Sequence, residues 1–191
     1  MSNMISFCTK IESLPDLSKW DTRKVKNMSH MITGNSELKK LPDISKWNTN
    51  KVEDMEHMFA YCRKIELFPD ISKWELSSIL NMSYMFSHCT NLNTYPNIFK
   101  WKIKNRANLR GIFYSCRRVT FPEKIDISDW DINEQCVVSY MFYDNYNFYW
   151  DFPDEQKIKM SDKFKIGFKF LDIWNNRDKY NYKDSNPSSN I

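Results

Sequence analysis

Four of the five cysteines share one position of a 27-residue period. Cys8, Cys62, Cys89 and Cys116 occupy it, and Asn35 fills the remaining place. A line of thiols could form a disulfide or hold a soft metal ion. No two of them are close in sequence, as Cys-x-x-Cys zinc sites require, and neighbours on stacked helices about 10 Å apart exceed the reach of a disulfide. We therefore predict reduced thiols buried in the core.

Histidines are a second candidate for metal chemistry. His30 and His57 share one position of the same period, which Tyr84 continues, and Glu56 precedes His57. Two stacked imidazoles and a carboxylate are ligands of the kind that divalent transition metals take. Exposed positions on a helical surface explain the same spacing without a ligand, and we favour that interpretation. No metal or other cofactor is predicted.

The glycine content excludes the common phosphate-binding loops. Only Gly34, Gly111 and Gly167 occur, whereas P-loops and dinucleotide fingerprints need several glycines at close, fixed spacing. The spacing indicates no Ser/His/Asp or Cys/His pair for nucleophilic catalysis. The net charge is only +4, from 28 basic and 24 acidic residues, and this does not favour a nucleic-acid partner. We expect a protein that is not an enzyme.

Polar side chains recur at another set of positions, which forms the candidate binding face. An acid or amide is followed two residues later by serine or, once, by phenylalanine. The members are Asp16, Ser18, Asp43, Ser45, Asp70, Ser72, Asn97, Phe99, Asp126 and Ser128. Such a row could dock another protein, as repeat proteins do, with Phe99 as an exposed anchor. A solvated strand face, with a lysine near each acid, is the alternative.

All these positions belong to an internal repeat. The segment LPDISKW at 41–47 has counterparts at 14–20, 68–74 and 95–101, and a weaker one at 125–130. A second motif, Met-x-x-Met-Phe in its clearest copies, begins eight residues after each tryptophan. The predicted core combines the tryptophans with the apolar residues of the second motif: Trp20, Trp47, Trp74, Trp101, Trp130, Met28, Met31, Met55, Met58, Phe59, Met82, Met85, Phe86, Phe113, Met141 and Phe142.

The two halves of each repeat differ in periodicity. In the second half, one face of a helix over 52–62 would contain Val52, Met55, Met58, Phe59 and Cys62. The first half alternates apolar and polar residues, most clearly over 125–128, as a short strand does. Stacked strands need about 4.8 Å and helices about 10 Å, so the stack must curve with its strands inside. We predict an α/β solenoid of about five to six strand–helix repeats with a concave strand face.

The combined motifs resemble a known repeat family. LPDISKW at 41–47 and NMSYMFSHC at 81–89 are similar to the 26-residue repeat of bacterial surface proteins, the BspA-like class of leucine-rich repeats. Members occur in mycoplasma lipoproteins, some protozoa and large DNA viruses. The resemblance covers roughly residues 1–153 and implies a leucine-rich-repeat-like solenoid that binds or adheres and has no catalytic residues. The chain departs from the family in its 27-residue period, in tryptophan where phenylalanine is usual, and in the lack of an export signal.

The expected domain organisation is a repeat solenoid over 1–153, a C-terminal capping segment over 154–175 and a disordered tail over 176–191. The first repeat begins without a polar cap, which would expose Met1, Met4 and Phe7. We therefore expect another chain, or a second copy of this one, to cover that end.

The sequence thus predicts a non-catalytic protein–protein interaction module that presents a repetitive concave face to another protein. A structural component of a larger assembly, such as a large-DNA-virus particle, and an adhesin-like surface protein are the alternatives. The chain shows neither a secretory signal nor an apolar run long enough to span a membrane. An intracellular or virion location is expected.

Overall fold

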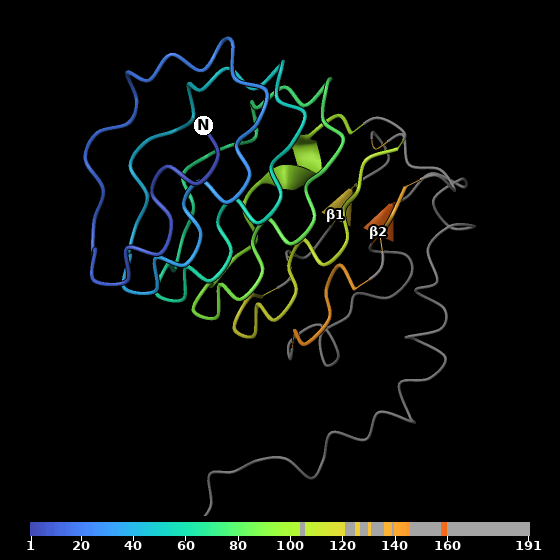
Figure 1. The fold of residues 1–191 in the computed structure, drawn as a ribbon. Helices are drawn as coiled ribbons and strands as arrows, with labels where there is room; N and C mark the ends of the chain where they lie inside the picture. Colours follow the sequence, from blue (N-terminus) through green and yellow to red (C-terminus); the bar gives the residue numbers. More distant parts are fainter. Residues whose placement is uncertain are drawn as a thin grey trace, which may run out of the picture.

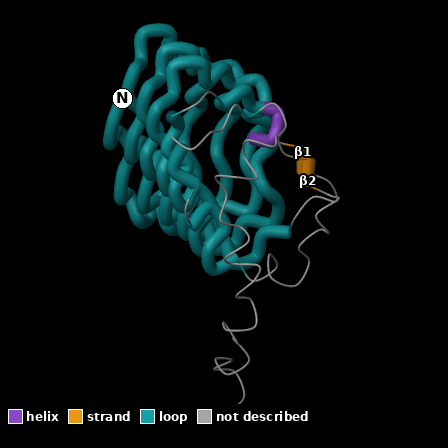
Figure 2. Tube along the Cα trace, turned by 90° about the vertical axis from the view of Figure 1, so that its right-hand side faces the viewer, coloured by secondary structure: helices purple, strands orange, loops and turns teal. Residues whose placement is uncertain are grey.

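The chain winds as a series of coils that lie side by side. The computed structural model describes residues 1–103, 106–120, 125–126, 130, 136–138, 140–145 and 158–159. Isolated parallel bridges join successive coils at equivalent residues, as from Asn27 to Asp54 and from Asp54 to Asn81. Figure 1 shows the coils following one another from the N-terminal end, and Figure 2 shows them from a perpendicular direction.

The regular elements among the described residues are few and short. A 3-10 helix, η1, spans Ile98–Lys100. Two strands, β1 (Ile125–Asp126) and β2 (Ile158–Lys159), pair in parallel with Ile125 opposite Ile158. β1 starts where the fifth repeat copy predicts a strand.

The structure does not describe most of the C-terminal segments that the sequence analysis defines. Apart from β2, the predicted cap over 154–175 lies outside the described residues. The predicted tail over 176–191 lies outside them as well. The described residues therefore test neither the cap nor the tail.

Backbone hydrogen bonds between tight turns hold the coils together. We call residues 28–34, 55–61, 82–88 and 109–115 the turn face. Alternate N–H groups of one coil donate to alternate carbonyls of the next, for example His30 to Glu56 at 2.8 Å and His57 to Ser83 at 2.9 Å. These bonds join neighbouring coils as they join neighbouring strands of a parallel sheet. They fix the register, so residues 27 apart become neighbours.

The helix predicted over 52–62 is not formed. His57 and Tyr61 have φ values of 52° and 60°, in the left-handed region that a right-handed helix excludes. Their N–H groups donate to the next coil and not to a carbonyl four residues back. Met55, Met58 and Phe59 are nevertheless fully buried, because consecutive turns bring side chains three or four residues apart to the same side.

The strand predicted in the first half of each repeat is also absent in the second coil. Leu41, Ile44 and Trp47 are buried there, and the residues between them are half-buried or exposed. Burial therefore recurs every third residue, whereas a strand would bury every second one. A turn bond from the Trp47 N–H to the Ile44 carbonyl, 3.2 Å long, accounts for the shorter path.

Two ladders of aromatic rings form the centre of the stack. Trp20, Trp47, Trp74 and Trp101 stack with centroids 6.1, 6.3 and 6.3 Å apart. The indole N–H groups of the last three donate to carbonyls of the preceding coil at 2.8 to 3.1 Å. A second ladder contains Phe59, Phe86, Phe113 and Phe142, with centroids 5.2 to 5.9 Å apart.

Burial of the predicted core varies along the stack. Met28, Met31, Met55, Met58, Phe59, Met82, Met85, Phe86 and Phe113 are fully buried, Trp47, Trp74, Trp101, Trp130 and Met141 are nearly so, and Trp20 and Phe142 are partly buried. The fully buried methionines and phenylalanines lie in the turn face. The turns therefore carry the apolar interior as well as the backbone ladder.

We predict that Phe86→Ala lowers the free energy of unfolding by about 3–5 kcal/mol, because it removes a ring stacked on both neighbouring coils and leaves a cavity. Denaturant unfolding followed by tryptophan fluorescence measures this. Leu80→Ala is the matched control: Leu80 is 56% exposed, so a change within about 0.5 kcal/mol is expected. Equal losses in the two variants would contradict the packing described here.

Candidate interaction surface

The aspartates of the candidate binding face lie exposed at the same place on successive coils. In Asp16, Asp43 and Asp70, Oδ1 accepts a hydrogen bond from the N–H of the serine two residues on, at 2.8, 2.9 and 3.0 Å. This arrangement is an Asx turn. Hydrogen bonds from those serines hold the pKa of each carboxyl below its ordinary value. The row consists of ionised acids whose orientation is fixed by their own backbone.

Lysines form a second row beside the aspartates. A lysine follows each aspartate or asparagine of the row by three residues. These lysines are all exposed: Lys19, Lys46, Lys73 and Lys100. The positive charge of the nearby lysine contributes, after the serine hydrogen bonds, to the lowered pKa of Asp16 and of Asp43. The face therefore has little net charge, and a partner would have to match an acidic row and a basic row at once.

The candidate face changes in the fourth coil. Asn97 is exposed and precedes η1 without a side-chain capping bond. Phe99, which η1 contains, packs against the core: its ring stacks on Trp130 at 6.5 Å and meets Tyr95 edge-on at 6.1 Å. Phe99 is thus half-buried and is not the exposed anchor expected from the sequence.

The other members of the candidate face add less to it. Ser18, Ser45 and Ser72 are half-buried, and their N–H groups are used by the Asx turns. The backbone of Asp126 lies in β1, and Ser128 lies outside the described residues. The exposed part of the face is the row of Asp16, Asp43, Asp70 and Asn97 together with the lysines.

The cysteine column is part of the core. The thiols of Cys62, Cys89 and Cys116 are buried, and each donates to a carbonyl of the preceding coil, at 3.2, 3.3 and 3.0 Å. Burial raises the pKa of Cys62 and of Cys116 to about 12 and that of Cys89 well above its ordinary value. All five cysteines are free thiols. The three buried ones are hydrogen-bond donors and not nucleophiles.

Histidine and tyrosine rings stack along the turn face in two rows, and the sequence indicated only the first of them as a column. His30 stacks on His57 at 4.9 Å, and His57 on Tyr84 at 5.1 Å. A second row begins with Tyr61 and His88, 4.4 Å apart. The sequence analysis placed the first row on an exposed helix, whereas the rings are half-buried on left-handed residues. The 27-residue spacing of Tyr61 and His88 was the available signal for the second row.

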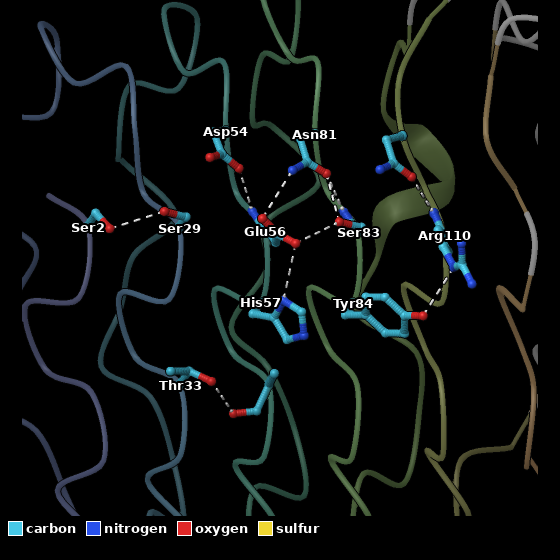
Figure 3. Close-up of polar contacts among 12 residues, drawn as sticks. Ser2, Ser29, Thr33, Asp54, Glu56, His57, Asn81, Ser83, Tyr84 and Arg110 are labelled. Carbon is cyan, nitrogen blue, oxygen red and sulfur yellow. Dashed lines mark hydrogen bonds and ion pairs between the residues drawn. The ribbon is translucent and has the colours of Figure 1, made fainter.

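The imidazoles of His57 and His88 are held in surroundings that oppose protonation. Burial, followed by the charge of His30, lowers the pKa of His57, although Glu56 opposes this with Oε1 3.6 Å from Nδ1 (Figure 3). Burial, then Arg63, lowers the pKa of His88, opposed by Asp144 and assisted by Arg117. Within the described part of the chain, no three histidine, cysteine or acidic side chains are grouped as metal ligands.

We predict that Cys62, Cys89 and Cys116 resist alkylation by iodoacetamide in the folded chain, because each thiol is buried and protonated at neutral pH. Cys8 and Cys136 are half-buried and should react first. Peptide mass spectrometry before and after addition of guanidinium measures the order. Equal modification of all five in the native chain would show that the coils do not protect this column.

We predict that the folded chain loses stability as the pH falls below about 6.5, the ordinary histidine pKa. Because the folded pKa of His57 and His88 is lowered, the unfolded chain takes up protons first, and stability declines until the pH has passed through the folded pKa values. Thermal unfolding between pH 7.5 and pH 5.5 measures this, with both pH values chosen to lie above the carboxyl range, about 4.

His57→Tyr together with His88→Tyr is the matched control for the pH dependence. Tyrosine already stands in the same columns, at Tyr84 and Tyr61, so the stacks are retained while the titrating groups are removed. The stability of the double variant should fall much less than that of the native chain between the two pH values. An unchanged decline would place its origin elsewhere.

Comparison with known proteins identifies the family of the chain. Residues 1–125 and 66–176 match the model of a family described as Mycoplasma protein of unknown function, DUF285. The two matches overlap, as an internally repetitive chain allows. No match was found among curated proteins or among solved structures. In the part that the structure describes, no helix is long and apolar enough to cross a bilayer. Since the family model covers most of its length, the chain belongs to the DUF285 family.

Proposed function

We propose that this protein is a non-catalytic protein–protein interaction module, a repeat solenoid that presents rows of like side chains to a partner protein. The observation that carries the proposal is the exposed row of Asp16, Asp43 and Asp70, whose carboxylates are oriented by Asx turns. A preorganised row loses little side-chain entropy on binding, and this favours affinity.

The charge pattern of this row supports the same proposal. At several other positions, charges in adjacent coils have opposite sign and pair across the coils, as Glu12 does with Lys39 and Lys26 with Glu53. The aspartate row repeats one sign, and Asp16 opposes the ionisation of Asp43. Like charges in neighbouring coils do not stabilise the stack. A partner whose charges complement the row would offset this repulsion.

The buried groups support a binding role over a catalytic one. Cys62, Cys89 and Cys116 are held protonated in the core by burial, and His57 stacks between two other rings. Neither group is placed to attack or deprotonate a substrate. Both act in packing.

We also propose that the repeats are of the BspA-like kind. Both half-motifs recur coil after coil, and one repeat corresponds to one coil. The family match to a group of mycoplasma proteins is consistent with this assignment. The turn face takes the place of the helix expected for a strand–helix solenoid.

We predict that Asp43→Asn together with Asp70→Asn weakens binding of the natural partner by about ten-fold or more, since two interfacial charges are removed. Asparagine retains the Asx acceptor, because Asn27 and Asn81 close the same kind of turn by accepting from the N–H two residues on. The partner is captured from a lysate of the native source with the full chain, identified by mass spectrometry, and titrated against both proteins.

Asp21→Asn is the control, because Asp21 is exposed and pairs locally with Arg23 outside the row. It should bind the partner as the native chain does. Equal affinity of the double variant would move the interface away from the aspartate row. The absence of any captured protein would favour a structural part of a preassembled particle.

A further inference from the structure

Four tyrosines and one arginine form a closed circuit of contacts between the last two segments of the turn face and residues 140–143 of the coil that follows. Tyr84 meets Tyr114 edge-on at 6.0 Å, Tyr114 stacks on Tyr143 at 5.1 Å, and Tyr143 meets Tyr140 edge-on at 5.8 Å. The Arg110 guanidinium lies over the Tyr140 ring, 5.1 Å from its centroid. Arg110 Nε donates to the Tyr84 hydroxyl at 3.2 Å and closes the circuit. We call these five residues the tyrosine–arginine circuit.

A glycine makes the circuit sterically possible. Gly111 occupies the place in its coil that His57 and Tyr84 occupy in theirs, with φ at 55°. A Cβ atom there would lie 2.5 Å from Cε1 of Tyr84, so any side chain would displace that ring. The gap in the ring ladder is instead spanned by Arg110, which reaches from Tyr84 to Tyr140 (Figure 3 shows Arg110 and Tyr84).

Arg110 differs from four other basic residues of the described coils whose side chains lie across coils. Those pair with an acid of a neighbouring coil: Lys26 with Glu53, Lys39 with Glu12, Lys64 with Glu37, and Arg117 with Asp144. Among the described residues, no ion pair joins Arg110 to a carboxylate; its contacts are a phenol oxygen and a ring. The side chain is exposed. It is a positive charge held in place and without a negative counterpart on that part of the chain.

The composition of the circuit is that of a protein-binding hot spot. Tyrosine and arginine are the residues most enriched at such sites, and a guanidinium fork suits a carboxylate. Tyr140 is 46% exposed, and the other three rings are half-buried, so the surface is partly desolvated yet open. Tyr84 stacks on His57, and Tyr114 stacks on Tyr143, so these ring faces are occupied by neighbouring rings. That arrangement favours a polar, acidic ligand over a stacked nucleobase.

We propose that the tyrosine–arginine circuit is a docking surface for an acidic segment of another protein, with Arg110 binding a carboxylate of that segment. The inference rests on the proposed function as an interaction module and adds a second surface, distinct from the aspartate row, together with the chemistry of its ligand. Tyr84 is a positioning residue, because its hydroxyl orients the Arg110 guanidinium.

A random peptide library selected on the immobilised full chain tests the proposal. We expect the selected peptides to be rich in aspartate and glutamate, and Arg110→Ala to bind them at least about ten-fold more weakly by fluorescence anisotropy. Tyr84→Phe should give a smaller loss. Selection of peptides without acidic enrichment, selection of none, or acidic peptides bound equally by Arg110→Ala would each overturn the proposal.

Control variants separate this surface from the aspartate row and from simple charge effects. Arg23→Ala makes the same change in net charge at an exposed arginine in a different coil and should keep the peptides. The double variant Asp43→Asn, Asp70→Asn should also keep them, whatever happens to the lysate partner. If Arg23→Ala lost peptide binding to the same extent, net charge alone would explain the effect and the proposal would be overturned. Tighter binding of a labelled oligothymidylate than of the peptides, lost in Arg110→Ala, would assign the circuit to nucleic acid and overturn it as well.

Unfolding curves of the variants show whether a loss of peptide binding comes from the missing side chain or from a loss of the fold. Arg110 is exposed, so Arg110→Ala should unfold within about 0.5 kcal/mol of the native chain. Arg110→Lys retains the charge but loses the fork, and it should bind the acidic peptides more weakly than the native chain. Native-level binding by Arg110→Lys would contradict the carboxylate geometry proposed here.

Discussion

Backbone N–H groups in the turns of one coil donate to carbonyls in the turns of the next, and this ladder requires an unusual backbone. His30, His57 and Tyr84 are left-handed, as are Tyr61 and His88. A left-handed residue other than glycine costs roughly 1–2 kcal/mol. Ring stacking between neighbouring coils contributes about 0.5–1.5 kcal/mol for each pair beyond area burial. The two magnitudes are similar, which explains why the strained positions of these coils carry rings that stack on one another.

Because the ladder fixes the register, each side chain lies against its counterpart in the next coil. Residue types that pack well on copies of themselves fill the interior: stacked indoles, stacked phenyl rings, and thiols that donate to a carbonyl. Asn35 shows how strict the constraint is. Where the cysteine column has this amide, its Nδ2 donates to the Ile5 and Ile32 carbonyls and its Oδ1 accepts from the Cys8 N–H. The amide satisfies backbone groups of its own coil and of the preceding one.

The sequence predicted the repeat, its period and the buried residue set, but not the backbone that carries them. Apolar residues three, four and seven apart suit a helix and a succession of turns equally well. The polar signal is also ambiguous: Asn81 accepts a hydrogen bond from the N–H of Ser83, as a helix N-cap would, yet here it closes an Asx turn. Gly34 and Gly111, aligned with ring columns, were the one hint of left-handed backbone. Phe99 was misplaced because serine holds the equivalent position in the three preceding copies, whereas the phenyl ring packs against Trp130 and Tyr95.

Positions that follow the repeat and positions that break it carry different information. A column of identical side chains can be explained by the register alone, since packing asks for the same residue in every coil. A break cannot be explained that way. Arg110 stands where the preceding coils have Ser29, Glu56 and Ser83, and Gly111 beside it leaves a ring column incomplete. The local backbone is unchanged there, because the Tyr84 N–H still donates to the Arg110 carbonyl at 2.8 Å. The fold therefore does not require this arginine, and its side chain is available for recognition by a partner.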